Sequence, residues 1–135
     1  MSGFGNFGAR AYVSVGVETG VSTSSPHALI LMLYDGALES LRKAIGCIDA
    51  QDPLGKTQAL SRATRIIDEG LRASLDHKAG GDLAGQLNGL YDYIVRRTMQ
   101  AGIDNDAAPL QESIRLLDEL REAWASIEPG DQAAA

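Results

Sequence analysis

The chain has 135 residues with a formal net charge of -6, and 44% of the residues are hydrophobic while only 5% are aromatic. This length predicts one domain that is large enough to bury a core. The acidic balance argues against a nucleic-acid-binding protein, which normally presents a basic stripe. A composition rich in alanine and leucine favours packed helices over sheets.

Cysteine content and hydropathy bear on the compartment. Cys47 is the single cysteine, so the chain cannot form an intramolecular disulfide, and we expect a reducing environment. The apolar run 28–34 is far too short to span a membrane. The first residues lack the charged start and long apolar region of a secretory signal. We therefore expect a cytoplasmic (cytosolic) protein.

Residues 1–22 are predicted to form a flexible N-terminal segment, because glycines at its start make ordering costly. Val13, Val15 and Val17 alternate with small or polar residues, which indicates a short extended or short helical stretch. A lone strand has no sheet to join. We therefore expect this segment to lie against the rest of the protein.

A first helix is predicted to begin after Ser24 or Ser25, with Pro26 in its first turn. It should end near Asp52, which precedes Pro53. Apolar residues recur along it every three or four positions, and the resulting stripe comprises Ile30, Tyr34, Ala37, Leu38, Leu41, Ile45 and Ile48.

Three further helices follow from the same periodicity. The second is predicted over 56–78, the third after an Asp82 cap, and the fourth after Asp104 or Asp106. Gly80 or Gly81 should adopt a left-handed conformation between the second and third helices. The expected inward residues are Leu60, Ala63, Ile67, Leu71 and Leu75; then Leu83, Leu87, Leu90, Tyr91, Ile94 and Thr98; then Leu110, Ile114, Leu117, Leu120 and Trp124.

These elements predict an all-α fold, an antiparallel up-down four-helix bundle with the N-terminal segment packed on it. Residues 23–129 would form the bundle domain, and residues 130–135 a disordered tail. Four helices of similar length joined by short turns pack most simply as antiparallel neighbours.

The run from Ala28 to Tyr34 contains no polar side chain, although a surface helix should have a polar face. The bundle needs only part of it, which leaves Leu29, Met32 and one middle leucine pointing elsewhere. A contiguous apolar patch of this kind marks an interaction site. Either the N-terminal segment covers the patch permanently, or it covers the patch until a partner binds.

The sequence offers little catalytic chemistry. The glycine pattern at 3–8 lacks the strand and helix that a dinucleotide site requires. No glutamate is followed by a histidine three residues later, as a di-metal bundle site would need. We therefore predict no catalytic residue, no metal site and no cofactor.

Two other functions remain as alternatives. A histidine phosphotransfer bundle would use His77, yet this residue is predicted at the end of the second helix, where its charge would complement the helix dipole. His27 is interpreted as a first-turn surface residue. A helical protein-interaction adaptor would use the acidic surface, and its binding should weaken strongly with salt.

Several sequence stretches resemble the flagellar export chaperone family FliS. The most specific are the Ser-Pro helix start followed by Leu33-Tyr34-Asp35-Gly36, the run Leu90-Tyr91-Asp92-Tyr93 with Arg96-Arg97, and Asn105-Asp106. They occur in the family's order, and the resemblance extends from about Ala11 to Pro129.

The resemblance implies a cytosolic chaperone, not an enzyme, that binds the C-terminal segment of flagellin. Such a chaperone prevents premature polymerisation of flagellin and keeps it competent for flagellar type III secretion without using nucleotide. A monomer that forms a 1:1 complex is expected, with components of the export apparatus as further candidate partners. Nucleic acid binding and membrane insertion are not expected.

The predicted partner-binding residues combine this resemblance with the apolar run. Tyr12 matches the N-terminal tyrosine that occupies part of the binding surface when substrate is absent. The predicted substrate-facing residues are Leu29, Ile30, Met32, Leu33, Tyr91 and Ile94. Some of these must be core residues, and periodicity does not separate the two groups. Tyr34 and Trp124 are expected in the interior.

Overall fold

The computed structural model describes residues 25–127, and over this range it is helical without strands. The elements are α2 (Pro26–Asp49), α3 (Pro53–Arg65), the π-helix η2 (Ile66–Arg72), α4 (His77–Asp104) and α5 (Ala108–Ala125). The all-α prediction is confirmed. The expectations for residues 1–22, including Tyr12, and for the tail 130–135 lie outside the described residues.

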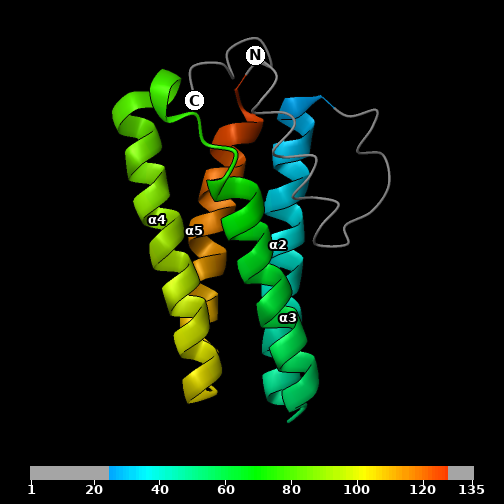
Figure 1. Ribbon diagram of the computed structural model, residues 1–135. Coiled ribbons are helices and arrows are strands. Elements are labelled where there is room, and N and C mark those ends of the chain that lie inside the picture. The colour runs from blue at the N-terminus through cyan, green and yellow to red at the C-terminus, as the bar shows by residue number, and fades with distance from the viewer. Residues whose placement is uncertain (1–24, 128–135) are drawn as a thin grey trace.

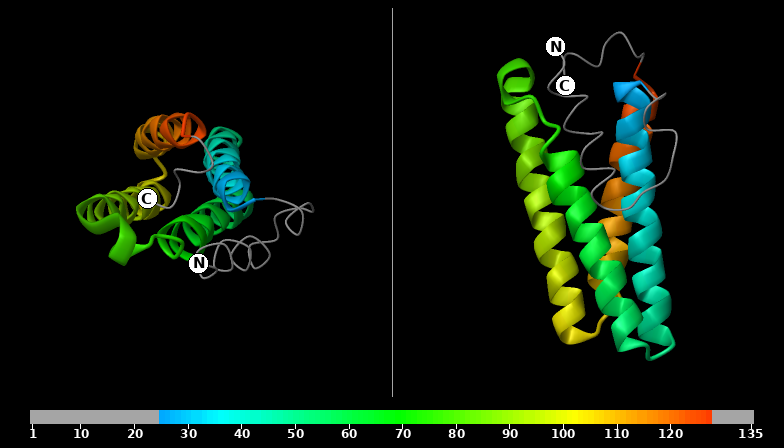
Figure 2. Two further views of the ribbon diagram at one scale, coloured as in Figure 1. Left: turned by 90° about the horizontal axis from the view of Figure 1, so that it is seen from above. Right: turned by 45° about the vertical axis from the view of Figure 1, so that its right-hand side comes forward.

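The helices form an antiparallel up-down bundle (Figure 1). Seen from above, each helix has two neighbours, so that α2 lies between α3 and α5 while α4 completes the ring (Figure 2). The helix η2 continues α3 along the same path and contacts both α2 and α4. One end of the bundle therefore holds the turn 73–76, and the other holds the turns 50–52 and 105–107.

Local signals fix the start and end of α2 as the sequence predicts. The Ser25 hydroxyl accepts a hydrogen bond from the Ala28 amide at 3.1 Å, and Pro26 occupies the first turn. After the helix, Gln51 has a positive φ of 58°, which reverses the chain. Asp52 then caps α3 by accepting from the Gly55 amide at 3.0 Å.

The boundaries predicted for the second helix, 56–78, are wrong at both ends. Helix α3 begins at Pro53, since Asp52 serves as its cap, and its continuation η2 ends at Arg72. At this end the Ser74 hydroxyl donates to the Gly70 carbonyl at 2.6 Å. That bond satisfies a carbonyl in the last turn, where the helical ladder runs out of donors.

The start of α4 also differs from the prediction. Asp76, not Asp82, caps the helix by accepting from the amides of Lys78 and Ala79. His77 therefore begins α4 rather than ending the previous helix, and its predicted interaction with a helix C-terminus is wrong. Gly81 does adopt a positive φ of 52°, but it forms a kink within α4.

Helix α5 follows a turn in which Asn105 has a left-handed conformation with a φ of 53°. The N-cap position of α5 is Ala107 rather than the predicted Asp104 or Asp106, although the Asp106 carboxylate accepts from the Ala108 amide at 3.0 Å. Helix α5 ends at Ala125, before Pro129 as predicted.

The core occupies the centre of the bundle and uses the predicted stripes. Its largest fully buried apolar side chains are Leu33, Leu41, Ile66, Ile67, Ile94, Leu110 and Leu117. Tyr34 and Trp124 are buried as expected. Gly70 allows η2 to approach α2 closely, because an added Cβ there would lie 2.9 Å from Leu33 Cδ2.

Polar contacts between helices stabilise the bundle at its surface. Arg121 of α5 donates to the Asp35 carboxylate of α2 at 2.6 Å. On the other side, Tyr93 and Arg97 of α4 both donate to Glu112 of α5 at 2.7 and 2.9 Å. These hydrogen bonds, the one from Tyr93 first, hold the pKa of the Glu112 carboxyl below its usual range.

Candidate protein-binding cavity

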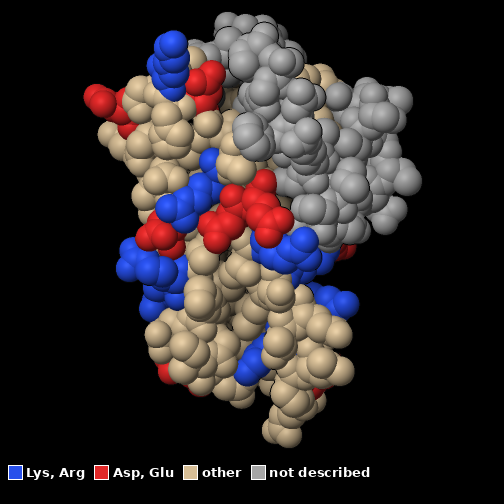
Figure 3. Space-filling model, viewed as in Figure 1, with Lys and Arg blue, Asp and Glu red and all other residues tan. Residues whose placement is uncertain are grey.

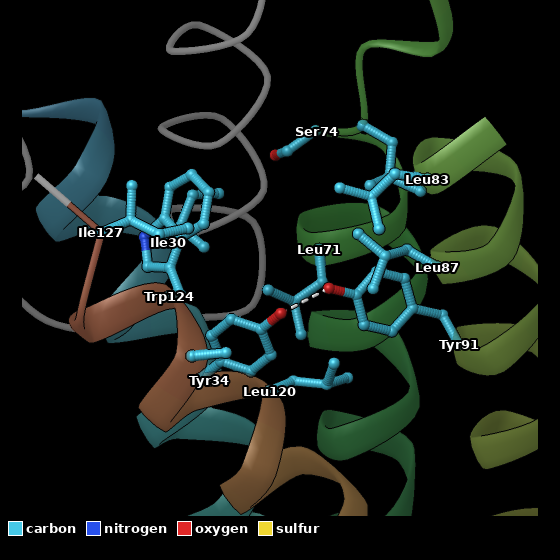
Figure 4. A pocket seen from close by; sticks show the side chains of 12 residues that line it. Ile30, Tyr34, Leu71, Ser74, Leu83, Leu87, Tyr91, Leu120, Trp124 and Ile127 are labelled. Atoms are coloured by element: carbon cyan, nitrogen blue, oxygen red, sulfur yellow. Dashed lines mark hydrogen bonds between the residues drawn. The ribbon is translucent and has the colours of Figure 1, made fainter. Parts of the chain in front are cut away.

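An apolar cavity of about 180 Å³ opens at the end of the bundle that holds the turn 73–76. Its lining side chains converge from four sides (Figure 4). They are Ile30 and Tyr34 of α2; Leu71, Ser74 and Leu75 around the end of η2; Leu83, Leu87 and Tyr91 of α4; and Leu120, Ala123, Trp124 and Ile127 in or after α5. We call this site the apolar cavity.

Two irregular backbone features shape the apolar cavity. The π-helix η2 supplies Leu71, and the wider π-turn shifts the side chains that follow relative to an α-helix. The Gly81 kink then separates the first turn of α4 from the part of the helix that carries Leu83, Leu87 and Tyr91. Both features lie where the chain crosses from η2 to α4, next to the cavity.

A pair of tyrosines forms the floor of the apolar cavity. The hydroxyls of Tyr34 and Tyr91 lie 2.6 Å apart and share a hydrogen bond that joins α2 to α4 (Figure 4). Burial raises the pKa of both phenols above the usual value, and for Tyr91 the neighbouring Tyr34 adds to the rise. The pair is therefore neutral at physiological pH and offers no free charge to a ligand.

Trp124, which lines the cavity, is held in place by a reciprocal contact with His27. His27 Nε2 lies 2.9 Å from the Trp124 carbonyl, while Trp124 Nε1 donates to the His27 carbonyl at 3.0 Å. Their rings stack with centroids 5.1 Å apart. The interpretation of His27 as a surface residue is therefore wrong, because the end of α5 covers it.

The lining is suited to binding apolar groups. The Ser74 hydroxyl already donates to Gly70 and the two phenols bond each other. A dry protein cavity of about 150 Å³ accepts a benzene-sized group, so this one has room for one or two apolar side chains. Among residues 25–127 there is no cluster of histidine, cysteine and carboxylate side chains that could hold a metal ion.

All the predicted substrate-facing residues except Met32 are buried, and they differ in whether they line the apolar cavity. Ile30 and Tyr91 line the apolar cavity. Leu33 and Ile94 are fully buried in the core, and Leu29 is also buried. Met32 is half-buried and packs against the core.

The apolar run of α2 is covered in the structure. Each residue from Ala28 to Tyr34 is buried or half-buried. Leu29, expected to point away from the bundle, is only 5% exposed although it does not belong to the core cluster. A covered patch is what both alternatives for the N-terminal segment expect, and that segment lies outside the described residues.

The sequence prediction did not identify the other lining residues of the cavity as part of a binding site. Leu71, Leu83, Leu87 and Leu120 fit the predicted core stripes, yet Leu83 is 49% exposed at the mouth of the cavity. The signal in the sequence was the double glycine before Leu83, which indicates a break in the helix. Periodicity alone treats every residue of a stripe as core, whether or not a neighbouring helix reaches it.

The alternative phosphotransfer site can be compared with its expected geometry. His77 is exposed in the first turn of α4. A phosphotransfer histidine was expected in mid-helix, so the position does not favour that function.

Comparison with known proteins identifies the family. The family described as Flagellar protein FliS matches residues 8–131 of the chain. The chain belongs to the FliS family of flagellar secretion chaperones.

Relatives of this FliS-family chain come from diverse bacteria. A protein named flagellar secretion chaperone FliS from Salmonella typhimurium is 46% identical over 122 residues, which cover 90% of each chain. The protein of that name from Escherichia coli is 38% identical over 117 residues, covering 87% of this chain and 86% of the relative. The one from Bacillus subtilis is 36% identical over 107 residues, covering 79% of this chain and 78% of the relative.

None of the described helices of this FliS-family chain is long and apolar enough to cross a membrane.

Proposed function

We propose that the protein is a cytosolic export chaperone that binds the C-terminal segment of flagellin. Binding would prevent premature polymerisation and keep flagellin competent for flagellar type III secretion, without nucleotide or cofactor. Membership of the FliS family supports the chaperone role. The observation that supports substrate binding is the apolar cavity. Its lining side chains are mostly hydrophobic and come from four sides of the bundle.

The physical chemistry of the cavity suits an amphipathic segment that is disordered when free. Such a segment loses conformational entropy when it binds, and it needs apolar contact to offset that loss. Each leucine-sized side chain that becomes fully buried contributes about 1.5 to 3 kcal/mol. One or two anchors in the cavity, with further contacts along the helices, can supply the required stabilisation.

We propose that flagellin first touches Leu83 at the cavity mouth, and that a side chain inserted into the cavity then reaches the predicted partner-binding residues Ile30 and Tyr91. Leu33 and Ile94 lie beneath this surface, and contact with them would require the helices to part. We further propose that Tyr12 covers the surface until flagellin displaces it. We also propose a 1:1 complex.

The test is calorimetric titration of the full chain with a peptide from the C-terminal region of flagellin of the same organism. We expect saturable binding, a negative heat-capacity change and little dependence on salt. Leu83→Asp should weaken binding at least about tenfold, because it places a charge at the cavity mouth. Gln86→Asp is the matched control, since it adds the same charge at an exposed position of α4 outside the lining.

Tyr12→Ala measured in parallel tests the displaceable cover. The substitution should tighten binding, because flagellin would no longer compete with the tyrosine. Absence of measurable binding by the unsubstituted chain would overturn flagellin as the substrate. Equal weakening by the two aspartate variants would overturn the cavity as its site.

A further inference from the structure

A second surface feature lies at the opposite end of the bundle, between α3 and α4. This groove is lined by Lys56 and Leu60 of α3 and by Thr98, Met99, Gly102 and Ile103 of α4, among others. It shares no lining residue with the apolar cavity. We call it the distal groove.

Large apolar side chains are exposed along the distal groove. Met99 is 57% exposed and Ile103 is 76% exposed. Leu54, which precedes Lys56 by two residues, is 68% exposed. Only one further large apolar side chain in the described part of the chain, Leu83 at the apolar cavity, is exposed. Met99 and Ile103 are four residues apart, so they lie on one face of α4. Such a concentration marks a contact surface on a soluble domain.

Gly102 sets the depth of the groove. A Cβ at this position would lie 3.0 Å from Leu60 Cδ1, so the missing side chain lets α4 approach α3 closely. Leu60 is itself only 9% exposed and forms part of the core cluster. The groove thus has a firm apolar floor between two helices, the geometry in which a third helix can dock.

Helix α3 is more basic than the other described helices, which bears on the charge of a partner helix that could dock beside it. Helix α3 contains Lys56, Arg62 and Arg65 and no carboxylate, although the whole chain has a net charge of -6. The other described helices, η2 included, each carry carboxylates. On the face shown in Figure 3, basic atoms lie between the lower parts of α3 and α4 in a largely uncharged surround.

Lys56 is held at the edge of the distal groove by uncharged acceptors. Its Nζ donates to the Gly102 carbonyl and to Asn105 Oδ1, both at 3.1 Å. The two arginines of α3 lie near carboxylates instead, Arg62 within 3.6 Å of Glu39 and Arg65 within 3.5 Å of Glu69. The Lys56 ammonium has three N–H donors and uses two of them in these bonds, so it can donate the third to a carboxylate from outside.

We propose that the distal groove is a second docking surface, which binds an acidic amphipathic helix of a partner protein while the apolar cavity is occupied. The apolar face of that helix would cover Met99 and Ile103. Its carboxylates would lie against Lys56, the cation of α3 that lines the groove. Because the two sites are at opposite ends of the bundle, occupation of one leaves the other accessible.

The probe is a synthetic helical peptide of about 14 residues, which matches the length of α3 at about 1.5 Å per residue. Leucines occupy one face and glutamates flank them, and a second peptide has lysines in place of the glutamates. Titration of the full chain should give binding of the glutamate peptide at least about tenfold tighter than of the lysine peptide. Added salt should reduce this difference, since exposed charges are screened.

Substitutions on the chain locate the site. Ile103→Asp should abolish binding of the glutamate peptide, and Lys56→Gln should weaken it several-fold. Gln86→Asp is the matched control, because it adds the same charge to the same helix at an exposed position outside both linings and should leave the probe affinity unchanged. Ile103 is largely exposed, so the variant should fold, and its thermal unfolding verifies this.

Other outcomes overturn the proposal and leave the proposed function standing. Binding of the probe that survives Ile103→Asp would exclude the groove. Displacement of the probe by the flagellin peptide would assign the groove to the substrate. A dimer of the unsubstituted chain that Ile103→Asp converts to monomer in sedimentation would assign it to a second copy. Failure of flagellin to bind at all would overturn only the function proposed above.

Discussion

The two ends of the bundle differ in where their apolar side chains lie. At the end with the apolar cavity, side chains from four sides surround a space that none of them fills. At the other end, Gly102 lies close to Leu60 at an open groove, and the large apolar side chains of Met99 and Ile103 remain on the outside. The same helices therefore present an internal site at one end and a surface site at the other.

Backbone irregularity accounts for much of the difference. The cavity end contains η2 and the Gly81 kink, whereas α2 and α3 meet at the distal end through a short turn with a side-chain cap. Between the two ends lies a fully buried core. The comparison predicts that stability depends mostly on this core, while binding depends on the ends.

The largest effect on stability should come from Leu33→Ala, which removes a fully buried side chain packed against Gly70. We expect the free energy of unfolding to fall by about 2 to 5 kcal/mol, because a cavity replaces tight packing. Leu83→Ala at the half-exposed mouth should cost far less. Urea denaturation of both variants measures the difference, and equal losses would contradict the separation of core from binding end.

The next effect should come from His27→Ala, which removes the contact between the start of α2 and the Trp124 carbonyl. Loss of the stacked ring and of a buried hydrogen bond should lower the free energy of unfolding by about 1 to 3 kcal/mol. His77→Ala is the matched control, since His77 is exposed. Thermal unfolding that shows similar losses for both histidines would contradict a stabilising contact between His27 and Trp124.

A smaller effect should follow from removing one hydroxyl of the tyrosine pair. Tyr34→Phe or Tyr91→Phe leaves the other buried hydroxyl without its present partner, which should cost about 1 to 2 kcal/mol. The double variant should lose less than the sum of the two single losses, because no polar group is then left unpaired. Additive losses in a double-mutant cycle would show that the hydroxyls do not interact.

The same pair gives a pH dependence with a definite sign. Burial raises the pKa of both phenols in the folded state above the usual value of about 10. The unfolded chain therefore loses these protons first, and stability should decline as the pH rises above about 10. The double phenylalanine variant should show a shallower decline in the same range.

The smallest effect should be a gain in stability from Thr98→Val. Thr98 is fully buried beneath the distal groove, and its hydroxyl forms no hydrogen bond within the described residues. Replacing the hydroxyl by a methyl group should raise the free energy of unfolding by up to about 1 kcal/mol. A clear loss in chemical denaturation would show that the hydroxyl has a partner in solution.

The sequence by itself determined the helical class, the antiparallel order and most of the core. Ser25 with Pro26 and Asp52 with Pro53 are local signals that act over one or two turns, so they can be recognised without tertiary information. The apolar stripes likewise reflect the helical period. They correctly placed Leu41, Ile67 and Leu117 in the interior, among others.

Tertiary structure alone decided which stripe residues have neighbours. His27 is covered because Trp124, 97 residues later, stacks on it. Leu33 is inaccessible because η2 approaches it at a glycine, whereas Leu83 is half-exposed because a kink precedes it. Hydrophobic periodicity records which way a side chain faces along its own helix. Whether another helix fills the space in front of it depends on packing between segments far apart in the chain.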